Sequence, residues 1–359
     1  MRAAIFVGTP ELSVEDVTPL DPGPRDVVVR IGASGVCHSD VSATNGSLPM
    51  PAPCVLGHEG TGTVEWTGPE VSRVDVGDRV IASFVPACGS CFFCLRGQSN
   101  LCELGNSINF LPKVTRADGS TANAFTALGT FADQMTVHEA CVVKIDTDVP
   151  DEQLALIGCG VTTGVGAALN TARVEPGTTV AVIGCGGVGQ AVIQGARIAG
   201  AARIIAVDPV EMKRKAAEQL GATDLVDPAT GDPVAQVHAL TGGRGADYAF
   251  EVIGLPETIN QAWATARRGG SVVVVGMPRM DSQVTLGGFG LFYEEKKLLG
   301  CVYGSSQVRR DFPRFVGLVE TGRLDLADMV SRTIGLDDVN DAFRAMQAGE
   351  VIRSVITHT

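Results

Sequence analysis

Four cysteines within fifteen residues constrain this chain more than any other feature. They follow the spacing C-x2-C-x2-C-x7-C, at Cys88, Cys91, Cys94 and Cys102. Such a spacing brings four thiolates around one tetrahedral Zn²⁺ within a single loop. A redox pair needs only two cysteines and usually opens a helix, whereas three of these recur at every third position. We therefore expect a structural zinc lobe at 88–102 rather than a redox centre or free thiols.

The length and charge of the chain favour a two-domain enzyme that acts on small molecules. Its 359 residues exceed what one hydrophobic core comfortably supports, and 45% of them are hydrophobic, which is enough for two cores. The net charge of -12 disfavours nucleic acid or an anionic membrane as the main partner, because phosphate binding needs concentrated lysine and arginine.

The sequence shows no sign of export or membrane insertion. Residues 1–7 form too short an apolar run to be a signal peptide, since Gly8 and Pro10 follow at once, and no apolar run approaches the length of a membrane span. We therefore expect a cytoplasmic protein. In a reducing compartment its ten cysteines are expected to be metal ligands and buried thiols rather than disulfides.

The pattern of expected secondary structure changes near residue 178. Up to about Val149, short β-branched runs such as 27–31 and 62–65 are broken by Gly and Pro, as in a barrel-like β domain. From Thr178 onwards strands and helices alternate, which predicts a doubly wound α/β domain with a parallel sheet. The expected strands are 179–183, 203–207, 224–226, 248–253 and 271–275, and the expected helices are 188–199, 210–220, 233–241 and 256–267.

A glycine-rich turn opens the first of these helices. Residues 184–189 read G-x-G-x-x-G at a strand-to-helix junction, where pyrophosphate can approach the helix N-terminus. Asp208 ends the next strand, at the distance expected of a carboxylate that binds a ribose 2′-hydroxyl. A carboxylate there repels a 2′-phosphate, so NAD is favoured over NADP. The alternative is that the glycines only permit helix–strand packing and that Asp208 is a turn residue.

A second metal site is suggested by Cys37, His58 and Cys159, each of which lies beside glycine or in a glycine-rich segment. Two thiolates and one imidazole leave the fourth position of a zinc ion open for water or substrate. The three residues are more than a hundred positions apart, however, and a lone histidine or cysteine is often a core residue. Spacing alone leaves the two interpretations evenly balanced.

In their order along the chain, the Gly57-His58-Glu59 segment, the four-cysteine lobe, Gly158-Cys159-Gly160, the glycine turn and Asp208 resemble the zinc-dependent alcohol dehydrogenases of the medium-chain dehydrogenase/reductase superfamily. The resemblance implies a GroES-like catalytic domain at 1–160, an NAD-binding Rossmann domain at 161–301 and a return to the catalytic domain at 302–359. It also implies two zinc ions. The catalytic ion is held by Cys37, His58 and Cys159, with Asp40 and Glu59 beside it, and the structural ion is held by the lobe.

The same resemblance implies the coenzyme contacts. Arg353 matches an arginine on the pyrophosphate, Lys213 a lysine near the adenosine ribose, and Thr163 and Val188 residues that press on the nicotinamide. His38 stands where many members carry an arginine. The implied coenzyme residues are His38, Thr163, Gly184, Gly186, Gly187, Val188, Gly189, Asp208, Lys213, Val275, Met277 and Arg353.

For the reaction, the resemblance implies hydride transfer between NAD and a primary alcohol or its aldehyde. Ser39 matches the hydroxyl that accepts the alcohol proton, whereas Ser42 replaces the histidine that ends the relay in well-known members. Medium-chain or aromatic alcohols suit the implied pocket, which comprises Ser39, Leu48, Phe84, Phe131, Met277 and Val302. The alternative substrate is the S-hydroxymethyl adduct of formaldehyde with mycothiol. A non-enzymatic nucleotide-binding member is disfavoured because all three zinc ligands are present.

The assembly is expected to be a homodimer, with a homotetramer as the alternative. The stretch from Cys102 to Phe131 is as long as in dimeric members of the family that the chain resembles. Strand edges near 272–275 and 299–303 are predicted to pair across a two-fold axis. The remaining partner is then a small-molecule alcohol or aldehyde.

Overall fold

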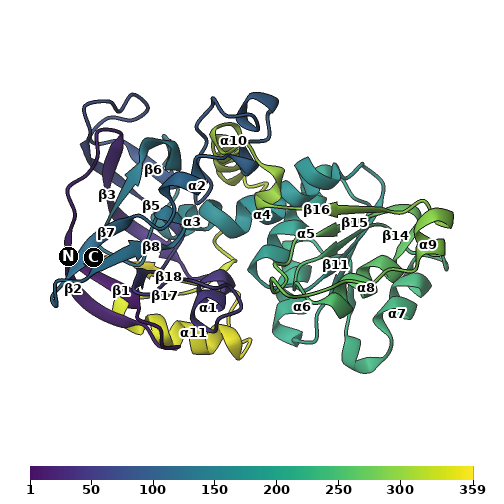
Figure 1. Cartoon of the computed structure of the whole chain (residues 1–359). Helices are drawn as coiled ribbons and strands as arrows, with labels where there is room; N and C mark the ends of the chain where they lie inside the picture. The colour runs from purple at the N-terminus through teal and green to yellow at the C-terminus, as the bar shows by residue number, and fades with distance from the viewer. Residues whose placement is uncertain (359) are drawn as a thin grey trace. The chain divides into compact units, whose positions relative to one another are not determined.

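A computed structural model describes residues 1–358 and divides them into two compact units (Figure 1). The first, here called the β-rich unit, contains residues 1–159, 307–322 and 326–358, and both chain termini belong to it. The second, here called the parallel-sheet unit, contains Gly160–Ser306 and Arg323–Asp325.

The β-rich unit combines a closed barrel with an open sheet. The barrel runs β1-β2-β7-β8-β4, and the sheet runs β10-β6-β5-β3-β18-β17, with β9 also paired to β3. In β3 alternate side chains enter the core, because Val27, Val29 and Ile31 are buried while Arg30 is exposed. The strands are β1 Arg2–Phe6, β2 Ser13–Pro19, β3 Asp26–Gly35, β4 Cys54–Val55, β5 Glu59–Thr67, β6 Arg79–Ala82, β7 Pro112–Arg116, β8 Thr121–Ala124, β9 Gln134–His138, β10 Val142–Lys144, β17 Val330–Ile334 and β18 Arg353–Thr357.

Helices of this unit are few, and the end of the chain returns to its sheet. The strand β18 pairs antiparallel with β3 and parallel with β17. Because Gly35 of β3 pairs with both Val355 of β18 and Glu59 of β5, the first residues of β18 and β5 come close together. The helices are α1 His38–Thr44, α2 Gly105–Ile108, α3 Asp151–Leu156, α10 Val308–Glu320 and α11 Val339–Gln347.

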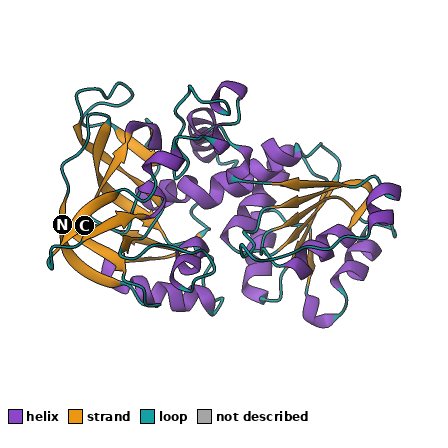
Figure 2. Cartoon of the chain, viewed as in Figure 1, coloured by secondary structure: helices purple, strands orange, loops and turns teal. Residues whose placement is uncertain are grey.

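The parallel-sheet unit has six parallel strands in the order β13-β12-β11-β14-β15-β16. Alternate residues of β11 enter two separate cores: Val180 and Val182 pack with α5, whereas Ala181 and Ile183 pack with α7 and α8. Helices therefore cover both faces of the sheet (Figure 2), and the predicted doubly wound fold is confirmed. The elements are β11 Thr179–Ile183, β12 Arg203–Val207, β13 Asp224–Val226, β14 Ala246–Glu251, β15 Ala266–Val274, β16 Lys297–Gly300, α4 Thr162–Gly166, α5 Gly187–Ala199, α6 Glu211–Leu220, α7 Pro233–Leu240, α8 Pro256–Thr265 and α9 Gly288–Tyr293.

Two sequence predictions about this sheet were wrong. The helix expected at 256–267 ends at Thr265, because Ala266 already pairs with Ala246 and its side chain enters the core. The strand at 272–275 is not a sheet edge, since β15 lies between β14 and β16. The edge strand on this side of the sheet is β16. It spans Lys297–Gly300 and so overlaps only the first residues of the second predicted edge, 299–303.

One helical stretch, Asp151–Ala172, has the length and composition of a membrane span. From the sequence, we predicted no apolar segment as long as a membrane span. The most apolar part of this stretch is 78% buried inside the protein, as in the core helix of a folded domain. Length and composition are therefore weak evidence of a membrane span here.

Candidate metal centres and coenzyme site

The three scattered residues Cys37, His58 and Cys159 meet in the β-rich unit. Together with Glu59 they offer ligand atoms that all lie within 4.8 Å of one another, and all four residues are buried. Cys37 directly precedes α1, His58 directly precedes β5, and Cys159 lies in a π-helical turn at Ile157–Val161. Such turns often occur at functional sites, because the wider turn re-aims a side chain. We call these four residues the buried cluster.

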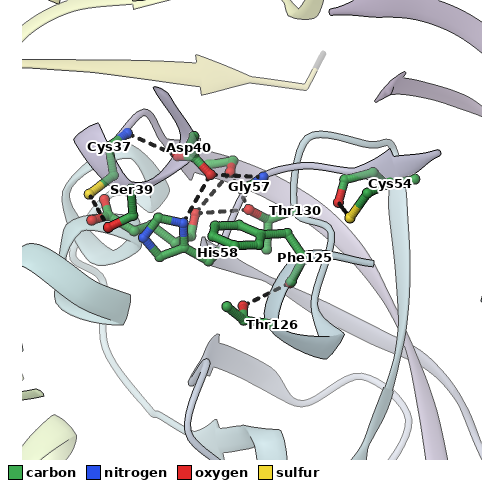
Figure 3. A network of polar contacts seen from close by, with 12 residues as sticks. Cys37, Ser39, Asp40, Cys54, Gly57, His58, Phe125, Thr126 and Thr130 are labelled. Carbon is green, nitrogen blue, oxygen red and sulfur yellow. Dashed lines mark hydrogen bonds and ion pairs between the residues drawn. The ribbon is translucent and has the colours of Figure 1, made fainter. Parts of the chain in front are cut away.

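Asp40 fixes the orientation of the imidazole in this cluster. Its Oδ1 lies 3.0 Å from Nδ1 of His58 and accepts a hydrogen bond from the backbone of Gly57, while Oδ2 accepts one from the backbone of Cys37 (Figure 3). The Nε2 atom of His58 is buried and has no hydrogen-bond partner among residues 1–358. A histidine that is held by a carboxylate through one nitrogen and left free at the other is prepared to bind a metal. The donor set therefore fits a zinc ion.

The charges around His58 also favour a cation. Burial opposes a positive charge on the imidazole, but the Asp40 carboxylate and the Cys37 sulfur outweigh it and raise the pKa of His58 to about 10. The neighbouring Cys159 thiol and the His58 imidazole in turn lower the pKa of Cys37 well below its ordinary value, against the effect of burial. The Cys37 thiolate and the Asp40 carboxylate thus place negative charge beside the imidazole, and a divalent cation in the cluster would be attracted to it.

Two phenylalanines enclose the imidazole. The rings of Phe84 and Phe125 meet the His58 ring edge-on, with centroids 5.8 and 5.3 Å away. Phe125 precedes Thr126 and Ala127, whose φ values of 50° and 64° are uncommon for residues other than glycine. Phe125 was not predicted from the sequence, because no motif marks this turn. Phe131, predicted as a pocket residue, is fully buried in the core, where its ring lies 6.4 Å from that of Phe343.

Glu59 has a charged partner from the end of the chain. Its carboxylate pairs with the guanidinium of Arg353, the first residue of β18, and the exposed fractions of the two side chains are 0% and 6%. The Nε atom of Arg353 is buried without a partner in the described chain. A buried carboxylate is costly unless a positive charge pairs with it, and the guanidinium of Arg353 supplies that charge to Glu59. The arginine that the resemblance assigned to the coenzyme thus also lies beside the buried cluster.

The four cysteines of the lobe converge as well. The Sγ atoms of Cys88 and Cys94 are 3.8 Å apart, and those of Cys91 and Cys102 are 3.9 Å apart. Tetrahedral zinc with Zn–S bonds of about 2.3 Å separates its sulfurs by about 3.8 Å, whereas a disulfide brings them to about 2.05 Å. None of the ten cysteines forms a disulfide. The geometry of the lobe therefore fits one zinc ion.

Two arginines hold the backbone where the lobe begins. Arg73 donates to the carbonyls of Ala87 at 3.0 Å and Cys88 at 2.8 Å, and Arg309 of α10 donates to the same carbonyl of Ala87. Ala87 lies three residues after Phe84 in the chain. The segment 84–88 is therefore held at one end by the contact of Phe84 with His58 and at the other by these hydrogen bonds to Ala87 and Cys88.

The glycine turn of the parallel-sheet unit has the form of a phosphate cradle. Gly184 adopts a φ of 93°, and a Cβ atom on Gly189 would lie 2.0 Å from the carbonyl oxygen of Gly184. At Gly186, by contrast, a Cβ atom would meet nothing within 4 Å. The first glycine therefore permits the turn, the third permits close packing of α5, and the second leaves space at the N-terminus of that helix. This space fits a dinucleotide pyrophosphate.

Asp208 follows β12 and is only 6% exposed. Its carboxylate accepts hydrogen bonds from the backbone of Cys185 and of Val210, both at 2.8 Å. The glycine turn and the end of the second strand are therefore tied together by this side chain. The thiol of Cys185 is fully buried, and burial raises its pKa, so it is a packing residue.

The remaining predicted residues fall into two groups. Ser39, His38 and Leu48 belong to the β-rich unit, where the Ser39 Oγ lies 3.9 Å from the Cys37 Sγ and His38 is exposed. The others belong to the parallel-sheet unit. Met277 and Val302 are about half exposed there, and the rest are partly buried: Thr163, Gly187, Val188, Lys213 and Val275.

A parallel dinucleotide-type sheet combined with a buried thiolate–imidazole cluster defines a zinc-binding oxidoreductase. Comparison with known families agrees: residues 23–147 match the alcohol dehydrogenase GroES-like domain, and residues 187–321 match the zinc-binding dehydrogenase family. The chain belongs to the zinc-dependent alcohol dehydrogenases of the medium-chain dehydrogenase/reductase superfamily. Zinc and a nicotinamide coenzyme are the cofactors of this class.

Individual relatives cover almost the whole chain. It is 40% identical to an S-(hydroxymethyl)glutathione dehydrogenase of Synechocystis sp., over 99% of both chains. It is 38% identical to alcohol dehydrogenase B of Mycobacterium tuberculosis, over 97% of this chain and 95% of that one. Among solved structures, benzyl alcohol dehydrogenase from Acinetobacter calcoaceticus matches with a TM-score of 0.93 and 32% identity, over 100% of this chain and 99% of that chain.

Proposed function

We propose that this enzyme oxidises primary alcohols to aldehydes with NAD, and that Cys37, His58 and Cys159 hold the catalytic zinc. This proposal rests on Nε2 of His58, which is buried close to the Cys37 and Cys159 sulfurs and has no hydrogen-bond partner among residues 1–358, while Asp40 engages Nδ1. When bound, the zinc lowers the pKa of the substrate hydroxyl and the nicotinamide accepts the hydride. The alcohol loses one hydride and one proton in each turnover.

The side chains around the cluster have separate tasks. Asp40 orients His58, and the Phe84 and Phe125 rings keep it in place and keep water out. The Ser39 Oγ lies 3.9 Å from the Cys37 Sγ, which supports a role for this hydroxyl in accepting the proton of the substrate. Ser42 cannot act as a base near neutral pH, so the proton continues through water or the coenzyme ribose. A pH–rate profile left unchanged in Ser42→His would speak against a relay through that position.

We further propose two zinc ions per subunit, the second in the cysteine lobe. The sulfur separations of 3.8 and 3.9 Å support this count. Elemental analysis of the purified protein tests it, since two zinc ions per chain are expected and one is expected in Cys94→Ala. The preference for NAD rests on Asp208, whose negative charge disfavours a 2′-phosphate.

For the substrate, aromatic or medium-chain primary alcohols are proposed. The aromatic rings beside His58 suit an apolar body next to the reacting carbon, and a solved relative carries the name benzyl alcohol dehydrogenase. The S-hydroxymethyl adduct of formaldehyde with mycothiol is the second candidate, favoured by the likeness to an S-(hydroxymethyl)glutathione dehydrogenase. Glutathione itself is disfavoured, because Leu48 stands where the glutathione-dependent branch typically has an acidic residue.

The decisive experiment measures NADH formation by the zinc-loaded enzyme with three substrates. These are benzyl alcohol, hexanol, and formaldehyde with or without mycothiol. Turnover of the free alcohols supports the main proposal. Activity only with formaldehyde and mycothiol would assign the enzyme to the thiol-adduct branch. No NADH formation with any substrate would contradict both proposed substrate classes.

We also propose a cytoplasmic homodimer formed through the parallel-sheet unit. The short helix α9 exposes 75% of Phe289, 79% of Phe292 and 54% of Tyr293, which is more aromatic surface than a soluble monomer usually leaves uncovered. The next strand in the chain, β16, pairs with β15 on one side and is the edge strand of the sheet within the described residues. A second copy that pairs the two β16 edges across a two-fold axis would cover both features.

A further inference from the structure

A buried carboxylate at the end of β14 has no role in the function described so far. Glu251 is the last residue of that strand, and its side chain is fully buried. It forms no ion pair in the described part of the chain, and its Oε2 atom has no hydrogen-bond partner there. Burying a carboxylate without a cation beside it is costly. Packing alone therefore does not account for a glutamate at this position.

The other oxygen of this carboxylate is fully engaged. Oε1 accepts hydrogen bonds from the backbone N–H of Ile253 at 2.9 Å and of Gly254 at 2.7 Å, and from the hydroxyl of Thr258 at 2.7 Å. An ionised carboxylate only accepts hydrogen bonds, as Oε1 does, whereas a proton on Oε2 would meet no acceptor among residues 1–358. Glu251 therefore places a negative charge inside the parallel-sheet unit.

This charge lies at the edge of the sheet where a dinucleotide binds. Glu251 pairs in parallel register with Ile183, the last residue of β11, and the glycine turn begins at the next residue, Gly184. The strand order reverses between these two strands, since β12 and β13 lie on one side of β11 and β14, β15 and β16 on the other. Dinucleotides bind outside the carboxyl ends of the strands at such a point. Glu251 therefore ends a strand at the coenzyme crevice.

The order of the strands also indicates which half of the coenzyme lies near Glu251. Asp208 follows β12, on one side of β11, and is the expected partner of the adenosine ribose, while the glycine turn after β11 receives the pyrophosphate. The nicotinamide half is then left to the side of β14. The backbone carbonyl of Glu251 accepts hydrogen bonds from Val275 at 2.8 Å and Gly276 at 3.0 Å. It is thus joined to the segment of Val275, one of the expected coenzyme residues.

The loops that follow β14 and β15 pack backbone against backbone around this carboxylate. A Cβ atom on Gly254 would lie 2.5 Å from the carbonyl oxygen of Met277, and one on Gly276 would lie 2.2 Å from the amide nitrogen of Gly254. This close packing and the burial of Glu251 keep bulk water away from its charge. A charge that water does not surround is weakly screened, so it acts on groups that it does not touch.

We propose that Glu251 tunes the redox equilibrium of the bound coenzyme, because its buried charge stabilises the positively charged nicotinamide ring of NAD⁺ relative to the neutral ring of NADH. In alcohol oxidation the substrate gives a hydride, which is one proton and two electrons, to the ring and releases a second proton to water, so the ring loses its positive charge. Glu251 then favours NAD⁺ binding over NADH binding. The inference rests on the proposed use of NAD and adds a residue that sets the balance between its two forms.

The test measures the dissociation constants of NAD⁺ and NADH by titration calorimetry on the zinc-loaded protein, without alcohol. Glu251→Gln removes the charge and keeps an oxygen that can accept the three hydrogen bonds made at Oε1. The ratio of the dissociation constant of NAD⁺ to that of NADH is expected to rise about threefold to twentyfold. The adenosine and pyrophosphate groups are common to both coenzymes and cancel in this ratio.

Three further variants separate the charge from its structural contacts. Thr258→Val removes one hydrogen bond to Oε1 without a change of charge, so it should alter both dissociation constants by the same factor. Glu257→Gln removes an exposed charge from the same helix, where water and salt screen it, and its ratio should equal that of the wild type. Glu251→Asp retains the charge and should keep a ratio close to that of the wild type.

A variant outside the core guards against a Glu251→Gln protein that does not fold. Ile253 is 43% exposed on the loop after β14, so Ile253→Lys leaves the core intact. A positive charge at this edge is expected to raise the same ratio. An unchanged ratio in Ile253→Lys would place the nicotinamide away from β14 and overturn the proposal.

The outcomes separate this proposal from the proposed function. Equal weakening of NAD⁺ and NADH in Glu251→Gln would overturn the role of the charge and leave the alcohol dehydrogenase function standing. A ratio that shifts as strongly in Thr258→Val would overturn it too. A shifted ratio confined to Glu251→Gln, in a protein that oxidises no alcohol, would support Glu251 and contradict the proposed function alone. A wild-type protein that binds neither coenzyme would contradict both.

Discussion

Oδ1 of Asp40 lies 3.0 Å from Nδ1 of His58, and both side chains are almost fully buried. This contact leaves Nε2 as the only imidazole nitrogen available to a metal. The same carboxylate also accepts hydrogen bonds from the backbone N–H of Cys37, a proposed ligand, and of Gly57, which directly precedes His58. Asp40 therefore positions both the imidazole and the peptide groups that carry the cluster.

Asp40→Asn should weaken zinc binding at the buried cluster about tenfold to a hundredfold, because it removes the charge that orients and strengthens the histidine ligand. Competition with a chromophoric chelator measures the affinity. Glu65→Gln is the control, since Glu65 pairs with Arg30 on the exposed part of the same unit. Unchanged zinc affinity in Asp40→Asn would show that the contact is structural only.

Arg309→Gln should loosen the cysteine lobe. The guanidinium donates to the carbonyl of Ala87 where the lobe begins, and losing a charged hydrogen bond at this partly exposed position costs about 1 kcal/mol. The expected result is faster zinc release from the lobe to a chelator. Arg314→Gln is the matched control on the same helix, since its contact with Asp311 is a loose 3.9 Å. Equal release rates in the two variants would contradict the role of Arg309.

Zinc affinity of the lobe should fall with decreasing pH, and more steeply below about pH 6. Burial raises the pKa of Cys94 to about 12, so zinc must displace its proton at any ordinary pH. Burial also acts on Cys88, but the N–H groups of Ser90 and Cys91 outweigh it and lower the pKa of that thiol to about 6. Below this pH a further proton competes with the metal.

The measurement is the affinity of the lobe for zinc between pH 5 and pH 8, roughly spanning the pKa of Cys88 on both sides. Cys88 should be a thiolate before binding above pH 6, so binding there releases fewer protons. A plot of the logarithm of affinity against pH should therefore bend near pH 6. A straight line through that region would contradict the lowered pKa of Cys88.

The sequence was sufficient to predict the elements that depend on local patterns. Three patterns lie in short segments of the sequence: the strand–helix alternation after Thr178, the glycine turn and the four-cysteine spacing. The structure correspondingly shows a six-stranded parallel sheet and four converging sulfurs. The boundary of α8 was missed because the pairing of Ala266 with Ala246, a contact distant in sequence, overrides the helical pattern.

Features that depend on distant contacts could not be read from the sequence. Phe125 contacts His58 from a turn in which the next two residues, Thr126 and Ala127, adopt left-handed backbone angles without being glycine, and no residue type in the sequence marks that turn. The pairing of Glu59 with Arg353 joins residues almost three hundred positions apart through the register of β3, β5 and β18. Family resemblance located Arg353, but the contact with Glu59 required the fold.

Asp208→Asn should reduce the preference for NAD over NADP by at least tenfold, because it removes a negative charge near the expected 2′-phosphate. Asparagine keeps an oxygen that can accept from the backbone of Cys185 or Val210, so the turn should survive. The ratio of kcat/KM for the two coenzymes is the readout. Asp224→Asn in β13 is the control, and an equal change there would point to general electrostatics rather than to Asp208.

If the proposed dimer forms through α9, Phe292→Glu should give a monomer that keeps its fold. Its side chain is 79% exposed on α9, so a charge there costs the monomer little, whereas burying that charge between two subunits without a partner costs several kcal/mol. Sedimentation velocity gives the oligomeric state, and far-UV circular dichroism gives the fold. Val76→Glu is the control, since Val76 is 62% exposed on the β-rich unit, away from α9 in the chain. A dimer that persists in Phe292→Glu and also in a variant with glutamate at Phe289 would place the interface elsewhere, because an interface that covers α9 buries both rings.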